Sequence, residues 1–279
     1  MSSLVVKKVL NNNVLIATHD MYDEVVLIGK GIGFQRTKGE VLTEHAVEKM
    51  FVLKDPTKQE QYKNLLPEID EKTFDTIVEA FELIRKETNS YLNEHVLVAL
   101  TDHIIFSVQR FIKGITIKNP FLIETKTLYP KEFEIAKKVV DIVKRATNLN
   151  LPDDEISFIT LHIHSVLSDK NLSEINFHSR LIGELILLIE SEMDIRLDKE
   201  SIDYMRLIRH LLFTVERINR GETLLDSPKI TLLLQNEYPF CYNLSWKLIK
   251  VMQNSLKKPV ENAEAIYLTM HLQRLMNKN

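Results

Sequence analysis

The chain has 279 residues, of which 44% are hydrophobic and 27% are charged, and its formal net charge at pH 7 is −3. This length allows two or three domains, and the composition is typical of a soluble globular protein. No apolar run approaches the roughly 20 residues needed to cross a bilayer, and a single cysteine cannot form an internal disulfide, so we expect a cytoplasmic protein without membrane insertion. Any contact with nucleic acid must come from a local surface, because the net charge is small.

The first 57 residues favour β-structure. Runs rich in β-branched residues at 4–10, 14–18 and 24–28 are each short enough to be single strands. Three asparagines at 11–13 separate the first two runs, and asparagine tolerates the positive φ angles of a tight hairpin turn. We therefore expect residues 1–57 to form a small antiparallel β-sheet domain.

Glycines cluster directly after the third run, in the sequence GKGIG at 29–33. The spacing differs from the GxGxxG of a dinucleotide site, and no helix is expected after it, which argues against a nucleotide site. The asparagine amides could pair with base edges, Phe34 could stack on an unpaired base, and Lys8 and Lys30 could contact phosphates. RNA binding and an ordinary solvated hairpin tip are both compatible with this pattern.

Beyond the sheet domain, apolar residues recur at helical spacing and the sequence repeats itself. LTDHIIFSVQR at 100–110 returns as LIRHLLFTVER at 207–217, and ITLHI returns downstream as LTMHL. Two landmarks kept in register indicate a duplicated domain. We expect two all-α helical bundles, at 58–170 and 171–279, which meet near a polar segment at 167–174. The expected fold class is therefore multidomain α+β.

Each repeat has a predicted helix with an apolar stripe and a glycine that could end it, Gly114 or Gly221. The predicted stripes consist of Leu100, Ile104, Val108 and Phe111 in the first copy and Leu207, Leu211, Val215 and Ile218 in the second.

Each repeat also keeps two histidines at the edges of apolar stripes. One interpretation is that they are half-buried structural residues. Another is that they accept a phosphoryl group, because imidazole keeps a free nucleophilic nitrogen at neutral pH and the added charge could remodel an interface. Asp102 precedes the first histidine of the first copy, whereas Arg209 precedes the first histidine of the second copy. Different phosphoryl donors could therefore phosphorylate the two copies. The four histidines are His103, His162, His210 and His271.

A metal site is the third interpretation, because His162 and His164 form an HxH motif. On a strand the two side chains would share a face, whereas on a helix they point about 200° apart. The surrounding residues have helical spacing, and the second copy has no counterpart of His164. Both observations argue against a metal, and we expect no cofactor.

In this order, VKKVLNNNVLIA, VLIGKGIGFQ and the duplicated histidine unit resemble bacterial transcriptional antiterminators of the BglG/SacY type. The resemblance covers essentially the whole chain. LNEHV, KNPFLIET and NEYPFCYN are most similar to the glucose-uptake branch, the GlcT proteins.

The resemblance implies a four-stranded antiparallel sheet that dimerises and binds a hairpin in leader mRNA, so that an overlapping terminator cannot form. It also implies two regulatory domains controlled by the sugar phosphotransferase system, through its enzyme II and, in many relatives, the phosphocarrier HPr. By resemblance the four histidines are phosphorylated. The RNA contacts implied by resemblance are Lys8, Asn11, Asn13, Gly29, Lys30, Phe34 and Gln35.

One position departs from the family pattern, because many members carry arginine where this chain has Lys30. Lysine keeps the positive charge but loses the planar fork for stacking or bidentate contacts. The expected function is a phosphorylation-controlled antiterminator that is not an enzyme. The alternatives are a phosphohistidine sensor that acts only on proteins, a DNA-binding activator, although residues 1–60 lack a helix-turn-helix pattern, and a metal hydrolase.

Overall fold

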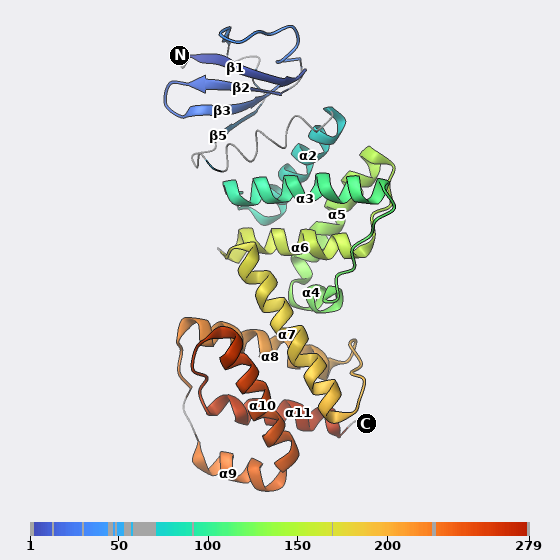
Figure 1. Cartoon of the computed structure of the whole chain (residues 1–279), viewed down its shortest axis with the longest axis vertical. Coiled ribbons are helices and arrows are strands. Elements are labelled where there is room, and N and C mark those ends of the chain that lie inside the picture. The colour runs from blue at the N-terminus through green and yellow to red at the C-terminus, as the bar shows by residue number, and fades with distance from the viewer. Residues whose placement is uncertain are drawn as a thin grey trace. The chain divides into compact units, whose positions relative to one another are not determined.

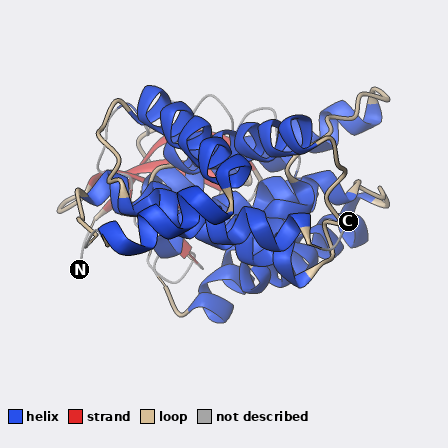
Figure 2. Cartoon of the chain, turned by 90° about the horizontal axis from the view of Figure 1, so that it is seen from below, coloured by secondary structure: helices blue, strands red, loops and turns tan. Residues whose placement is uncertain are grey.

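The structure is a computed structural model. It describes residues 3–12, 14–29, 31–43, 47, 49–52, 57, 71–90, 92–168, 170–224 and 227–277. Within these ranges the strands belong to one sheet, and the labelled helices follow the sheet in the chain (Figure 1). Figure 2 shows the strands in red and the helices in blue. The expected fold class, a small antiparallel sheet followed by helical domains, is confirmed.

The described strands pair antiparallel in the order β4-β1-β2-β3-β5. The resemblance implied four strands, and the two-residue β4 is an additional short strand at the edge of the sheet. The strands are β1 (Leu4–Asn11), β2 (Val14–His19), β3 (Asp23–Ile28), β4 (Val41–Leu42) and β5 (Lys49–Val52).

The sheet domain has its own hydrophobic core because alternate side chains of each strand point to one face. Leu4 and Val6 of β1 pack in one cluster with Leu15 of β2 and Leu27 of β3. The predicted asparagine turn joins β1 to β2, with the last residue of β1 opposite Val14. The predicted β-hairpin is confirmed, and its turn marks one end of the sheet.

Ten labelled helices follow within the described residues. They are α2 (Glu71–Thr88), α3 (Glu94–Ile112), α4 (Leu122–Leu128), α5 (Pro130–Thr147), α6 (Asp153–Ser168), α7 (Leu172–Met193), α8 (Ile202–Arg220), α9 (Pro228–Glu237), α10 (Pro239–Leu256) and α11 (Ala263–Met276).

The two predicted apolar stripes lie on α3 and α8, and each belongs to a separate core. Leu100 and Ile104 of α3 pack with Ile159 of α6 in one cluster. Leu207 of α8 packs with Leu268 of α11 in the other. Each stripe therefore joins two helices that are far apart in sequence, and these two helix pairs position the predicted histidines.

Local sequence explains where the histidine-bearing helices begin and end. The side chain of Asn93 accepts a hydrogen bond from the Val96 amide at the start of α3, and Ser201 caps α8 through Tyr204 in the same way. Gly221 ends α8 in the left-handed conformation, with φ of 68°, which glycine adopts without steric cost. The predicted helix stop at Gly221 is confirmed.

The described chain forms two compact units, and one helix of the first repeat belongs to the second unit. Unit 1 comprises residues 1–118 and 131–169, and unit 2 comprises 119–130 and 170–279. The segment 119–130 contains α4, which lies between α3 and α5 in the sequence but packs on α8. The predicted domain boundaries at 57/58 and 170/171 remain predictions.

Candidate functional site

The first pair of predicted histidines lies between α3 and α6. The ring centroids of His103 and His162 are 5.1 Å apart, and the rings are tilted by 43°. Nε2 of His103 lies 3.1 Å from Oε2 of Glu155, and a terminal nitrogen of Arg110 lies 2.8 Å from Oε1 of the same carboxylate. Two histidines, a glutamate and an arginine therefore form one cluster.

The second pair has the same arrangement between α8 and α11. The rings of His210 and His271 are stacked with centroids 4.8 Å apart. Nε2 of His210 lies 3.7 Å from Oε2 of Glu264, and Arg217 donates to Oε1 of that carboxylate at 2.6 Å. Thr214 donates to Oε2 at 2.9 Å. The duplication therefore preserves a four-residue cluster rather than isolated histidines.

The two glutamates were not among the residues predicted from the sequence. Each lies seven residues before the second histidine of its repeat, and each arginine lies seven residues after the first histidine. Seven residues are nearly two helical turns, so both partners lie on the same helix face as their histidine. The conserved offset between repeats was the signal that could have identified Glu155 and Glu264.

Burial favours the neutral form of His162, His210 and His271. Burial and then the proximity of His103 lower the pKa of His162 to about 3. Burial, followed by the charges of His271 and Arg217, lowers the pKa of His210 to about 3. Burial also lowers the pKa of His271. A neutral imidazole can attack phosphorus, whereas an imidazolium cannot, so this environment suits the acceptor of a phosphoryl group.

The glutamate of the first cluster remains ionised. Burial alone would raise the pKa of Glu155, but hydrogen bonding to His103 and the charges of His103 and Arg110 bring it below its ordinary value. In this cluster Nδ1 of His162 is buried without a hydrogen-bond partner. A buried polar atom left in this way destabilises the fold, so its presence needs a functional or conformational reason.

The two clusters differ in access to solvent. His162 is only 6% exposed, whereas its counterpart His271 is half-buried. Aromatic residues flank both clusters at equivalent positions. The ring of Phe158 lies 5.8 Å from that of His103, and the ring of Tyr267 lies 5.9 Å from that of His210. The second histidine is therefore closed to solvent in the first cluster and partly open to it in the second.

The HxH motif does not converge on one point. His162 and His164 both lie on α6, but Nδ1 of His164 is 2.9 Å from Oε1 of Glu132 on α5, away from the ring of His103. Among the described residues, no group of three or more His, Cys, Asp or Glu side chains is arranged to hold a metal ion. None of the described helices is long and apolar enough to cross a membrane.

The glycine-rich loop and the asparagine turn, which carry most of the predicted RNA contacts, meet at one end of the sheet. The amide of Gly33 donates to the carbonyl of Asn12 at 2.8 Å, so the glycine-rich loop lies against the asparagine turn. Ile32 is buried beneath this loop, whereas Phe34 is 58% exposed. The contacts implied by the resemblance do not include Asn12, yet its main-chain carbonyl joins the two segments.

Four of the other predicted RNA contacts lie within the described residues. Lys8 is exposed on β1, and Gly29 lies directly after β3. Gln35 is exposed and has a φ of 54°, an uncommon conformation for a side-chain-bearing residue. Asn11 ends β1, while Asn13 and Lys30 lie outside the described residues.

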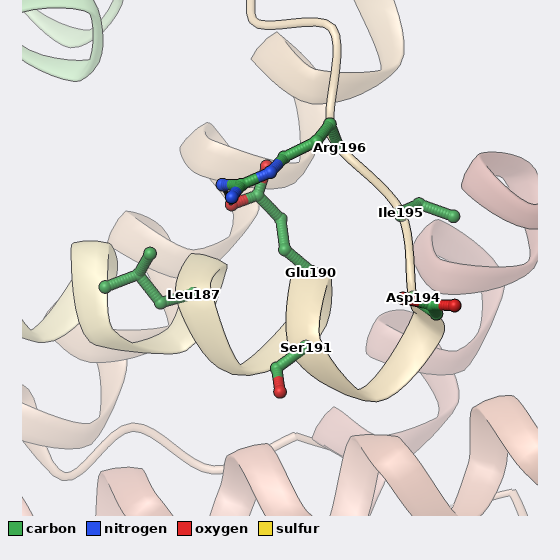
Figure 3. Close-up of a pocket in the computed structure, with 6 residues that line it drawn as sticks. All are labelled: Leu187, Glu190, Ser191, Asp194, Ile195 and Arg196. Atoms are coloured by element: carbon green, nitrogen blue, oxygen red, sulfur yellow. Dashed lines mark ion pairs between the residues drawn. The ribbon is translucent and has the colours of Figure 1, made fainter.

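A separate pocket of about 440 Å³ lies at the end of α7. Figure 3 shows the side chain of Arg196 reaching over Glu190, while Ser191 points away from both. Arg196 lies 3.7 Å from Glu190, which also accepts a hydrogen bond from the Leu197 amide. The polar groups of this pocket stabilise the turn after α7. None of the residues that line the pocket belongs to the histidine clusters.

Comparison with known proteins assigns a domain type to each part of the chain. Residues 4–60 match the CAT RNA binding domain, and residues 58–166 and 183–275 each match the PRD domain.

The similar proteins include full-length relatives. The PtsGHI operon antiterminator of Bacillus subtilis (strain 168) is 53% identical over 99% of this chain and 98% of the relative. The GlcA/glcB genes antiterminator of Staphylococcus carnosus (strain TM300) is 40% identical over 100% of this chain and 98% of the relative. A crystal structure of GlcT CAT-PRDI matches the fold with a TM-score of 0.54 and a sequence identity of 52%. The match covers 60% of this chain and 99% of the chain in the crystal structure.

Proposed function

The chain belongs to the antiterminator family that combines a CAT RNA-binding domain with two PRD domains, and on this premise we propose that it controls transcription through a leader mRNA. The sheet domain binds a hairpin in the nascent transcript and prevents an overlapping terminator from forming. Since relatives are named for the ptsGHI operon and the glcA and glcB genes, the proposed target is a glucose permease gene.

The RNA-binding surface in this proposal is the end of the sheet where the glycine-rich loop meets the asparagine turn. An exposed aromatic ring on a loop fixed by main-chain hydrogen bonds suits stacking on an unpaired base. Phe34 supplies that ring, and the Gly33–Asn12 hydrogen bond supports the loop. The proposed contacts are Lys8, Asn11, Asn13, Gly29, Lys30, Phe34 and Gln35.

The two histidine clusters are the proposed switch, with phosphorylation at His103, His162, His210 and His271. Enzyme II of the phosphotransferase system transfers phosphate to the first PRD domain when sugar is scarce and thereby inactivates the protein. HPr is the proposed donor for the second PRD domain. A phosphoryl group beside a buried, ionised glutamate introduces repulsion and favours a different arrangement of the domains.

The functional species is a cytoplasmic homodimer, with an RNA-binding domain at 1–57 and regulatory domains at 58–170 and 171–279. The protein accepts phosphate without turning over a substrate, so it acts as a regulator and not as an enzyme.

The observation that carries the proposal is the recurrence of the complete cluster. His103, His162, Glu155 and Arg110 return as His210, His271, Glu264 and Arg217 with the same contacts. A purely structural histidine needs one satisfied partner, whereas each cluster keeps two imidazole rings in contact beside a carboxylate.

The test is transcription in vitro with the full chain. The protein first selects a hairpin from a pool of structured RNAs, and that hairpin is then placed so that it overlaps a terminator. We expect terminator readthrough, its loss when enzyme II phosphorylates the protein, and its persistence in the His103→Ala/His162→Ala variant. Phosphorylation without any selected RNA would instead indicate a sensor that acts only on proteins.

A further inference from the structure

One face of α8 carries exposed cationic residues next to the second histidine pair. Arg206, Arg209, His210 and Phe213 follow the spacing i, i+3, i+4 and i+7, which places them along one side of the helix. Both arginines are exposed, and Phe213 is 57% exposed. The stripe therefore runs from two arginines, past the histidine, to an aromatic ring.

The adjacent face of α11 carries the same kinds of residue in the reverse chain order, with an aromatic residue first and an arginine last. The same i, i+3, i+4 and i+7 spacing is found for Tyr267, Met270, His271 and Arg274. The side chains of Tyr267 and Met270 are 41% and 40% exposed. The two helices run antiparallel along this face, because Arg217 contacts Glu264 whereas His210 stacks on His271 further along.

Consequently Arg206 and Arg274 lie at the same end of the pair, beyond His271. After burial, the charges of Arg274 and Arg206 are the main causes that lower the pKa of His271, while Asp203 opposes them. A terminal nitrogen of Arg206 lies 3.5 Å from Oδ1 of Asp203, and the arginine side chain is 56% exposed, so solvent screens this ion pair. This end of the helix pair, the cationic end, therefore lies next to His271 and carries more positive than negative charge.

The first repeat lacks this cationic end although it keeps the histidines. Ala99 stands where the second repeat has Arg206, Asp102 stands in place of Arg209, and Ser165 stands in place of Arg274. The aromatic end is retained as Phe106 and Phe158, at the positions of Phe213 and Tyr267. At these positions the repeats therefore differ in charge at the end beyond the second histidine and keep aromatic rings at the other end.

We propose that Arg206 and Arg274, with Arg209 beside them, form a clamp for a phosphoryl group carried by His271, and that the first repeat has no such clamp. The inference rests on the proposed phosphorylation of the second pair. Arginine suits this role because its planar fork donates two hydrogen bonds to neighbouring phosphoryl oxygens. The clamp favours the dianionic form of a phosphoryl group on the second histidine pair. In the first pair, no arginine at the equivalent positions compensates the charge of a phosphoryl group.

The covalent step is a simple transfer. A ring nitrogen of neutral His271 attacks phosphorus, the N–P bond forms, and the bond between phosphorus and the donor breaks, with its electron pair leaving on the donor. The other ring nitrogen loses its proton to water, which leaves a neutral ring and an anionic phosphoryl group. The arginines contact only the phosphoryl oxygens, so they change its ionisation and not the identity of the acceptor.

The first test measures that ionisation by phosphorus NMR on the full chain phosphorylated with phosphoramidate, whose leaving group is ammonia. The second pKa of a protein phosphoryl group is about 6. We expect it to lie lower for phosphohistidine 271 than for phosphohistidine 162, and to rise by roughly 0.5 to 1 unit in the Arg206→Gln/Arg274→Gln variant. Loss of the resonance in His271→Gln assigns it.

Arg220→Gln is the matched control, because it removes the same charge from an exposed position on α8 ten residues beyond His210. An unchanged titration in the double arginine variant would overturn the clamp while leaving the proposed phosphorylation intact. Absence of phosphohistidine at every one of the four histidines would overturn the proposed switch and the clamp together.

A second measurement is independent of phosphorylation. His271→Asp places a permanent negative charge beside the same arginines. We expect Arg206→Gln/Arg274→Gln to lower the unfolding temperature by roughly 2 °C more in the His271→Asp background than in the natural chain. Equal effects in the two backgrounds would show that the arginines do not contact an anion at position 271.

Discussion

Arg217 donates two hydrogen bonds to one carboxylate oxygen of Glu264, from Nε at 2.9 Å and from a terminal nitrogen at 2.6 Å. The carboxylate is only 3% exposed, so the arginine supplies the charge that permits its burial. The other carboxylate oxygen faces His210 and Thr214. This ion pair holds α8 against α11 and thereby fixes the second histidine pair.

The first prediction concerns this ion pair. Arg217→Met leaves a buried carboxylate without its cation, and we expect a loss of about 2–4 kcal/mol in the free energy of unfolding. Glu264→Gln keeps an acceptor for Thr214 and leaves a half-buried cation that can reach water, so its cost is smaller. Urea unfolding of both variants measures the difference. A Glu264→Gln variant less stable than Arg217→Met would contradict this assignment of charge burial.

The second prediction follows from the pKa of His162, which burial and then His103 lower from an ordinary value of 6.5 to about 3. Between these values the unfolded chain binds a proton that the folded chain does not, so stability increases with pH and levels off above about 6.5. We expect His162→Gln to reduce the loss of stability between pH 6.5 and 5 by as much as about 1.4 kcal/mol per pH unit.

The measurement is urea unfolding of the full chain at several pH values within that window. The lower limit of pH 5 avoids Glu155, whose lowered pKa makes its contribution disappear only as pH falls further. Identical pH dependence in the natural chain and in His162→Gln would show that position 162 is not a buried neutral imidazole.

The third prediction tests the aromatic contact with RNA. Phe34→Ala should weaken binding of the selected hairpin by about 1–3 kcal/mol, which is the usual contribution of stacking on one base. Phe34→Trp preserves a flat ring and should retain most of the affinity. Met21→Ala serves as control, because Met21 is an exposed apolar residue, 74% accessible, in the turn between β2 and β3. Equal losses for Phe34→Ala and Met21→Ala would exclude a specific stacking role.

Local patterns in the sequence predict much of this architecture. The asparagine turn, the apolar stripe that begins at Leu100 and the helix stop at Gly221 depend on neighbouring residues, so sequence reasoning can identify them. Glu155 and Glu264 were missed because their neighbours differ between the repeats, as DDEIS and NAEAI. Only the constant spacing to the histidine marks them, and their pairing with arginine depends on tertiary packing.

The position of α4 illustrates what local pattern cannot reveal. Oε1 of Glu124 on α4 accepts a hydrogen bond from the hydroxyl of Tyr204 on α8, and Nζ of Lys199 lies 2.9 Å from the same oxygen. Burial and then this hydrogen bond raise the pKa of Tyr204. In sequence, Glu124 is an ordinary acidic residue of a short helix in the first repeat. Its partners lie in the second repeat, and no periodicity or motif links them.

The last prediction tests this docking through Gly183 on α7. A Cβ atom at that position would lie 1.8 Å from Cε1 of Phe121, the residue that precedes α4. On helix propensity alone, Gly183→Ala should stabilise the chain by up to about 1 kcal/mol. If α4 is docked as described, the ring must leave its position, and we expect a net destabilisation of about 1–2 kcal/mol instead.

A double-mutant cycle separates the two effects. In a Phe121→Ala background the clash is absent, so Gly183→Ala should become neutral or stabilising when urea unfolding is compared between the four proteins. The change of sign is diagnostic, since helix propensity acts equally in both backgrounds. A stabilising Gly183→Ala in the natural chain would mean that the ring of Phe121 does not rest on α7.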